Sequence, residues 1–226
     1  MGGIPTDWRA QVLTQDAQGA DKKIKGLLAC GEAACASVHG ANRLGANSLL
    51  DLVVFGRRAA ETTREDYMPG QAQRDLAPNA GEESIAMLDR LRFSTGSTPT
   101  AKIRTEMQVA MQKYAAVFRR QDYLEMGCDV LHEASQKITD IGISDRGNIW
   151  NTDLVEAMEL DNLMIQAKMT MFAAENRKES RGAHARDDFT ERLDDTWMKH
   201  TMTYLSDPTD KPKITFRDVI HTTLDD

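Results

Sequence analysis

A glycine-punctuated loop that runs directly into an apolar segment, residues 31–57, constrains the fold more than any other stretch of the chain. Two glycines flank a single arginine, Arg43, and Asn47-Ser48 then opens a run that is apolar almost all round. Such a run predicts a buried helix rather than a surface helix. The first N–H groups of a helix have no partner inside it and lie at its positive end. The sequence therefore predicts a place where small anions meet the protein backbone.

Arg43 is the first candidate binding residue. A guanidinium presents a planar fork that matches a carboxylate through two parallel hydrogen bonds, which lysine cannot reproduce. An arginine held between glycines can lie close to the backbone and recognise a dicarboxylic acid. The alternative is an arginine that pairs with an acid and pins the loop, and the residues alone leave both interpretations open.

Two neighbouring features support the same chemistry. Glu32 follows a short strand-like run, and acids in that position hold sugar hydroxyls in nucleotide-binding folds; the alternative is a helix-capping acid. Asn47 and Ser48 lie where a helix N-terminus would stabilise electron density arriving on an acceptor. They are also typical N-cap residues, and the two roles are compatible.

Apolar periodicity divides the chain into regions. Short strands are expected at Gln11–Thr14 and Leu27–Cys30, with a polar loop over 15–25 between them. Periodicity is weak from Asp66 to Gly81, which predicts a linker. Alternation resumes over 197–205 and 214–220, which predicts a small C-terminal hairpin.

Three apolar stripes at helical spacing lie between the linker and the hairpin and predict a helical bundle. We expect a glycine break at Gly127 between the first two helices, cap residues at 151–153 before the third, and methionines as core filler rather than cofactor ligands. The stripes consist of Met107, Ala110, Met111, Tyr114 and Phe118; of Val130, Leu131, Ala134 and Ile138; and of Leu160, Leu163, Met164, Ala167, Met171 and Ala174.

Composition excludes several classes of protein. A net charge of -7 and a pI near 5.3 argue against nucleic-acid binding, which needs a basic surface. The 3 cysteines form no metal-binding pattern and predict reduced thiols. No apolar run approaches the ~20 residues that span a bilayer. The start Met1–Thr6 fits an N-myristoylation pattern, but it equally fits an internal turn that happens to start at a methionine.

Residues 31–57 closely resemble the flavoprotein subunits of succinate dehydrogenase and fumarate reductase, and the resemblance continues nearly to the C-terminus. It implies that Arg43 binds a carboxylate of a dicarboxylate substrate and that Ala46 lines the same pocket. It implies that Glu32 contacts FAD and that Ser48 and Leu49 lie against its isoalloxazine ring. No catalytic acid–base residue and no metal ligand are expected in this chain.

The segment Ser180–Arg186 also matches the family, and we expect it to pack against the flavin domain or a partner. His39, beside the substrate loop, is a candidate second-layer donor. The resemblance implies an α+β fold: the C-terminal strand–helix part of a FAD-binding domain over 1–65, a linker over 66–80, a helical domain over 81–180, and a small domain with a β-hairpin over 181–226.

The family's Gly-x-Gly-x-x-Gly fingerprint, its capping domain and the histidine that binds FAD covalently are expected upstream of the residues present here. We therefore expect a C-terminal piece of a split flavoprotein subunit of a succinate:quinone oxidoreductase, inactive as an isolated chain. Its partners would be an N-terminal flavoprotein polypeptide, an iron–sulfur subunit and, indirectly, membrane-anchor subunits. The location would be the matrix side of the mitochondrial inner membrane or the cytoplasmic face of a bacterial membrane. The alternatives are a non-catalytic scaffold or assembly protein, and a fragment of a full subunit.

Overall fold

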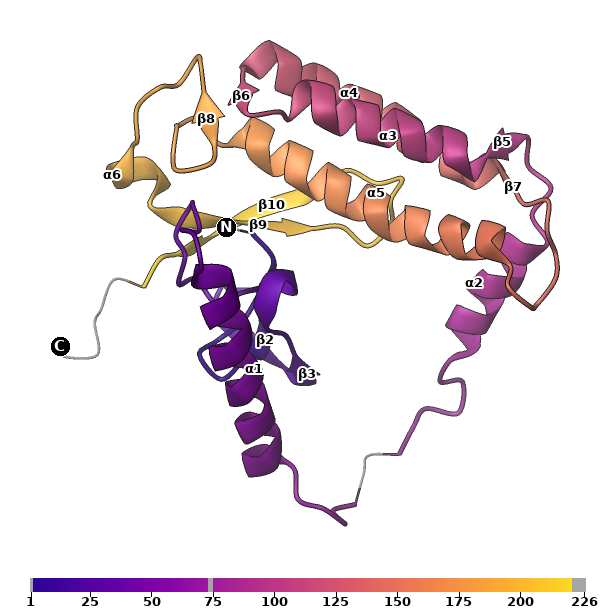
Figure 1. Ribbon diagram of the computed structural model, residues 1–226, viewed down its shortest axis with the longest axis horizontal. Helices are drawn as coiled ribbons and strands as arrows, with labels where there is room; N and C mark the ends of the chain where they lie inside the picture. The colour runs from indigo at the N-terminus through magenta and orange to yellow at the C-terminus, as the bar shows by residue number, and fades with distance from the viewer. Residues whose placement is uncertain (1, 73–74, 221–226) are drawn as a thin grey trace. The chain divides into compact units, whose positions relative to one another are not determined.

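The structure is a computed structural model that describes residues 2–72 and 75–220, so positions 221–226 of the predicted C-terminal domain and 73–74 of the predicted linker lie outside it. The chain divides into two compact units. The first unit consists of Met1–Asp75, Arg181–Ala183 and Arg217–Asp226, and the second consists of Leu76–Ser180 and His184–Phe216. Figure 1 shows both units and labels most of their helices and strands.

The first unit contains two small sheets. One joins β1 to β4 in parallel, and the other joins β2 to β3 in antiparallel. The predicted strand at Gln11–Thr14 is confirmed, whereas the predicted polar loop over 15–25 is wrong in its second half because β3 begins at Asp21. Nearly every residue of β3 is exposed, so no apolar alternation marked it in the sequence. The strands are β1 (Ile4–Pro5), β2 (Gln11–Gln15), β3 (Asp21–Leu28) and β4 (Ala34–Cys35).

Helix α1 (Asn47–Asp66) follows the glycine-punctuated loop, as predicted. Its C-terminal half contacts the turn between β1 and β2: Thr62 is buried and its hydroxyl donates to the Arg9 carbonyl at 2.9 Å, while Arg58 stacks 4.7 Å from the centre of the Trp8 ring. These contacts fix the direction of the helix within its unit.

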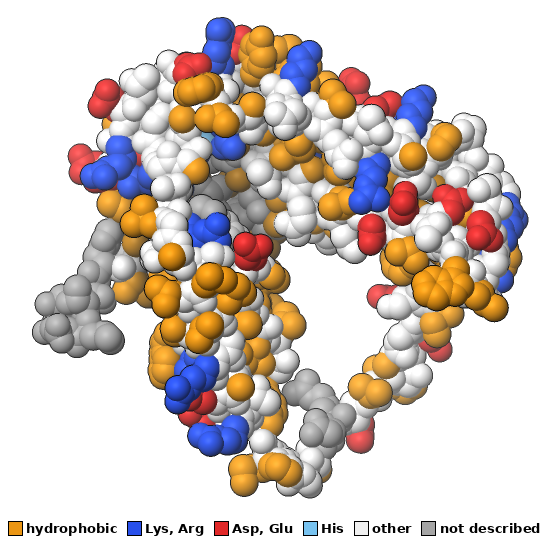
Figure 2. Space-filling model, in the orientation of Figure 1, with side chains coloured by type: hydrophobic (Ala, Val, Ile, Leu, Met, Phe, Trp, Pro, Cys, Tyr) orange, Lys and Arg blue, Asp and Glu red, His pale blue; other side chains and the backbone are white. Residues whose placement is uncertain are grey.

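The N-terminal half of α1 is exposed, and the prediction of a buried helix is wrong for the described residues. Leu49 is 68% exposed and Val53 is 70% exposed, with Leu50 and Val54 also above half. Figure 2 shows hydrophobic side chains gathered over this helix. The apolar pattern is that of a buried helix, but no described part of the chain covers this face.

The second unit is a helical bundle in which the three predicted helices are confirmed as α3, α4 and α5; they are preceded by α2, which the sequence did not predict. The helices are α2 (Glu82–Arg92), α3 (Thr100–Tyr114), α4 (Gln121–Gln136) and α5 (Thr152–Asn176). Asn151 caps α5, accepting from the Leu154 N–H at 2.9 Å. Their shared core contains Leu91, Ile103, Met107, Ala110, Leu124, Cys128, Leu131, Ala134, Ile141, Ile143, Leu154, Ala157, Leu160, Met164, Ala167, Met171 and Ala174.

Two details of the predicted bundle are wrong. Gly127 does not break a helix but lies inside α4, where an added Cβ would come within 2.7 Å of Tyr114 Cβ and of the Met171 side chain. The glycine is there because three helices approach closely, not because the chain turns. Phe118 does not continue the first stripe; it lies beyond the end of α3 and is 74% exposed.

Short elements complete the second unit, and the predicted C-terminal hairpin is confirmed as the two-stranded sheet β9–β10. Two further pairs, β5–β7 and β6–β8, are parallel. No helix in the described residues is long and apolar enough to cross a bilayer. The remaining elements are β5 (Thr98–Pro99), β6 (Phe118–Arg119), η2 (Lys137–Asp140), β7 (Ile141–Gly142), β8 (Ala185–Arg186), α6 (Asp194–Trp197), β9 (Lys199–Tyr204) and β10 (Lys213–Asp218).

Candidate functional site

The loop before α1 has an unusual backbone. Ser37, Gly40 and Ala46 all have left-handed φ values, of 64°, 58° and 65°. Glycine adopts this region freely, but a residue with a Cβ does so at a cost of roughly 1–2 kcal/mol. Such outliers persist where surrounding contacts dictate the backbone, and they are common at ligand sites.

Three contacts from distant parts of the sequence hold this loop. The imidazole Nε2 of His39 lies 2.7 Å from Asp51 Oδ2 on α1. Arg217 Nη2 donates to Ser37 Oγ at 3.1 Å. The Ala183 N–H donates to the carbonyl of Ala41 at 3.0 Å. His39 therefore fixes the loop rather than facing a ligand directly.

The structure brings two of the predicted site residues together. Glu32 lies in the short helix η1 (Gly31–Ala33), and its Oε1 is 3.6 Å from Arg43 Nη1. A Cβ on Gly31 would meet Leu52 of α1 at 2.3 Å, so η1 is pressed against the helix that the Arg43 loop enters. The Arg43 and Glu32 side chains are 35% and 78% exposed.

This geometry bears on the two interpretations of Arg43. A separation of 3.6 Å is longer than a hydrogen bond, and an exposed ion pair contributes only about 0–1 kcal/mol. The loop already has stronger anchors through His39 and Ala41. The pairing with Glu32 therefore leaves the guanidinium accessible to a carboxylate. The capping interpretation of Glu32 is wrong, because it lies within η1 rather than at its N-cap.

The N-terminus of α1 completes this region. The N-cap position is Ala46, not Asn47 or Ser48, and no side chain caps the helix at its start. The N–H groups of Leu49 and Leu50 reach the Ala46 carbonyl at 3.1 and 3.5 Å. The first turn carries no acidic residue, so its positive end has no built-in negative partner. The predicted capping role of Asn47 and Ser48 is wrong.

Within the second unit, His184 and Arg186 of the predicted Ser180–Arg186 segment belong to a polar cluster. Arg119 donates to His184 Nδ1 at 2.8 Å, which assigns the proton to Nε2, and Nε2 donates to the Arg177 carbonyl at 3.1 Å. Burial, with three arginines nearby, lowers the pKa of His184 to about 4. His184 is therefore a neutral structural residue.

Arg186 is the other buried member of this cluster. Its guanidinium grips Asp188 with two hydrogen bonds of 2.7 and 2.9 Å and reaches Gln121 Oε1 at 2.8 Å. The guanidinium of Arg186 lowers the pKa of the Asp188 carboxyl to about 2. A buried arginine needs such partners, so Arg186 stabilises the fold through these hydrogen bonds.

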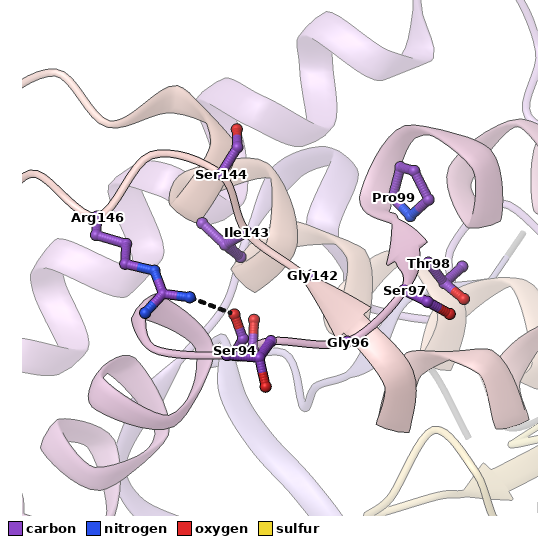
Figure 3. Close-up of a pocket in the computed structure, with 10 residues that line it drawn as sticks. Ser94, Gly96, Ser97, Thr98, Pro99, Gly142, Ile143, Ser144 and Arg146 are labelled. Carbon is purple, nitrogen blue, oxygen red and sulfur yellow. Dashed lines mark hydrogen bonds between the residues drawn. The ribbon is translucent and has the colours of Figure 1, made fainter.

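A separate shallow pocket of about 410 Å³ lies in the second unit between the β5 and β7 segments (Figure 3). None of the predicted site residues lines it. The hydroxyls of Ser97 and Thr98 donate to Asp140 at 2.6 and 3.0 Å, and Arg146 donates to the Ser94 carbonyl at 3.3 Å. These bonds hold the chain segments around the pocket together.

No group of histidine, cysteine and acidic side chains in the described residues is arranged to hold a metal ion. None of the three cysteines, all of which lie in the described residues, forms a disulfide. Burial raises the pKa of Cys128 to about 12, so this thiol is unreactive.

Comparison with known proteins identifies both parts of the chain. The family model described as the fumarate reductase flavoprotein C-terminal region matches residues 104–225, and that of the FAD-binding domain matches residues 1–49. The mitochondrial succinate dehydrogenase flavoprotein subunit of Oryza sativa subsp. japonica is 54% identical over all of this chain, and that of Rickettsia bellii is 47% identical. A solved structure of E. coli quinol fumarate reductase has a TM-score of 0.85 with 35% identity over 98% of this chain.

The chain spans only part of these relatives: 35% of the rice subunit, 38% of the Rickettsia subunit and 37% of the E. coli chain. The α+β architecture predicted from the sequence is that of the matching flavoprotein region. Because the C-terminal family model alone matches more than half of the residues, the chain belongs to the succinate dehydrogenase and fumarate reductase flavoprotein family.

Proposed function

We propose that this chain supplies the C-terminal part of a succinate dehydrogenase flavoprotein subunit and that Arg43 binds a carboxylate of the dicarboxylate substrate. The observation that carries the proposal is an accessible guanidinium on a rigidly held loop, directly before an uncapped helix N-terminus. A bidentate arginine recognises a carboxylate, and Ala46 between them has too small a side chain to obstruct it.

The residues around this loop fit FAD. The first turn of α1 offers a positive helix end without a capping side chain, with Ser48 in that turn and Leu49 exposed beside it. Glu32 is exposed and can accept hydrogen bonds from sugar hydroxyls. FAD, when bound, accepts the hydride in this chemistry. This chain's share is to orient one end of the substrate and to stabilise negative charge at the α1 N-terminus.

The remaining groups would come from elsewhere. We propose that a separate N-terminal polypeptide carries the nucleotide-binding half of the flavin domain, the covalent FAD attachment and the acid–base residue. The exposed apolar half of α1 supports this, since hydrophobic faces of this kind mark association surfaces. Electrons would pass to an iron–sulfur subunit and on to quinone through membrane-anchor subunits, with the complex peripheral to the mitochondrial inner membrane or a bacterial membrane.

Substitution of Arg43 in the assembled complex tests this function. Arg43→Ala should cost about 2–5 kcal/mol of transition-state binding, because a substrate carboxylate is left unpaired. Arg43→Lys keeps the charge but loses the fork and should lower kcat/KM by at least about 10-fold. The measurement is succinate oxidation with an artificial acceptor, beside FAD quantitation, which should not change.

Arg192→Ala is the matched control, because that guanidinium is 64% exposed and pairs with Asp194 on the surface. It should leave kcat/KM unchanged. Near-wild-type turnover and substrate affinity in Arg43→Ala would reduce Arg43 to a loop anchor paired with Glu32. That result would favour a non-catalytic scaffold as the role of this chain.

A further inference from the structure

The tripeptide Arg181–Ala183, which we call the strap, lies directly on the substrate loop inside the first unit. The Ala183 N–H donates to the Ala41 carbonyl at 3.0 Å. A Cβ added to Gly182 would come within 2.5 Å of the Ala41 carbonyl oxygen, 2.6 Å of its carbonyl carbon and 2.8 Å of its Cβ. The strap thus meets the loop backbone to backbone, with no room for a side chain between them.

The contact falls at an informative place in the loop. Ala41 lies two residues before Arg43, and two residues of chain span at most about 7 Å. Any displacement of the Ala41 peptide is therefore passed almost directly to the Arg43 backbone. The loop on the other side of Arg43 is already fixed, because α1 begins at Asn47.

Gly182 combines a left-handed backbone with close packing, and both properties favour a glycine. Its φ of 57° is left-handed, and its hydrogen atom faces a peptide that would collide with any larger group. A left-handed glycine does not by itself imply such packing: Gly19 of the first unit has φ 85°, and nothing lies within 4 Å of a Cβ placed on it. Conformation alone does not account for the packing at Gly182.

We propose that the strap is a positioning element for substrate binding, in which Gly182 and Ala183 set the place from which Arg43 reaches a dicarboxylate. The inference rests on the proposed role of Arg43 and extends it to residues with no side-chain chemistry of their own. Gly182 is a positioning residue that acts through Ala41.

A double-substitution cycle in the assembled, FAD-loaded complex tests the proposal, with malonate as the dicarboxylate probe. Gly182→Ala should weaken malonate binding by at least about 10-fold while FAD content is unchanged, because Arg43 is displaced. In the Arg43→Ala background, Gly182→Ala should add almost nothing, since residues that act through one another are not additive. Gly19→Ala, with the same kind of backbone strain and open space, should bind malonate normally.

The outcomes separate the two claims. If Arg43→Ala leaves malonate affinity unchanged, the proposed function fails. If Arg43→Ala weakens binding but Gly182→Ala does not, or if their effects add, the positioning role of the strap is overturned.

A measurement on the unsubstituted complex covers the case in which Gly182→Ala does not assemble. Malonate should slow hydrogen exchange at the Ala183 amide by at least about 10-fold, because a ligand on Arg43 holds Ala41 against the strap. Exchange that malonate does not change would overturn the proposal.

Discussion

The two units of this chain differ in how completely they bury their own apolar surface. In the second unit, four helices share a core of buried side chains such as Leu131, Leu160 and Met171. In the described part of the first unit, the buried hydrophobic residues are Ala10 and Val12, while the first two turns of α1 face outward. The second unit therefore has a hydrophobic core of its own, whereas the first unit leaves much of its apolar surface exposed.

The candidate substrate and flavin residues all lie in the unit with the incomplete core. Their positions depend on backbone contacts and a few ion pairs rather than on a packed interior. Under the proposed function, this site is completed when a second polypeptide covers the apolar helix beside it. The packed core that stabilises the fold thus lies in the second unit, and the candidate site lies in the first.

Two helix-interior glycines provide the largest contrast between the units. Gly127→Ala in α4 should destabilise the second unit by about 1–3 kcal/mol, because its Cβ would overlap Tyr114 and Met171. Gly56→Ala in α1 should stabilise that helix by up to about 1 kcal/mol, since nothing lies within 4 Å and alanine favours the helix. Native-state hydrogen exchange of the chain in dilute solution measures the opening of each helix.

If Gly127→Ala and Gly56→Ala changed stability in the same direction, the contrast between the two units would not hold. A destabilising Gly56→Ala would mean that α1 is packed against something in the chain itself. A stabilising Gly127→Ala would mean that the bundle core yields easily at the α3–α4–α5 contact.

A smaller effect concerns pH. Since burial lowers the pKa of His184 to about 4 in the folded second unit, the unfolded chain binds more protons between that value and 6.5. Stability of this unit should therefore be at its full value above pH 6.5 and should fall as the pH is lowered through this window toward 4. Hydrogen exchange in α5 across the window measures the fall.

His184→Gln is the control, because an amide keeps hydrogen-bonding capacity without titrating in this range. The fall should be shallower in this variant. Exchange in α1 should be far less sensitive to His184, because that residue belongs to the second unit. An identical pH dependence in the wild type and His184→Gln would show that this imidazole is not buried neutral.

The bundle could be predicted because its signal is local and periodic. The stripes around Met107, Leu131 and Leu160 face a common core, so apolar spacing alone located α3, α4 and α5. The prediction for Gly127 is wrong because the sequence does not distinguish a glycine that ends a helix from one that lets a neighbouring helix approach closely. Strand β3 was missed in part because its exposed polar residues carry no alternation.

The sequence predicts residues of the candidate site but not the contacts that hold them. Resemblance to the family pointed to Arg43 and Glu32, and the structure places them 3.6 Å apart. No sequence pattern indicates that Ala183 donates to Ala41, because the bond joins two backbones far apart in the chain. The pair of His39 and Asp51 joins the loop to α1 across twelve residues, and no local sequence pattern indicates it.

The central claim is that this chain completes a flavin site only together with the rest of a flavoprotein subunit. The most direct measurement is the FAD content of the chain purified alone and after co-expression with a polypeptide carrying the remainder of a succinate dehydrogenase flavoprotein subunit. The account predicts a poorly soluble, flavin-free chain alone and a co-purifying complex with stoichiometric FAD, in which hydrogen exchange over Leu49–Val54 is slowed. A soluble yellow protein from this chain alone, or a failure of the two polypeptides to associate, would contradict it.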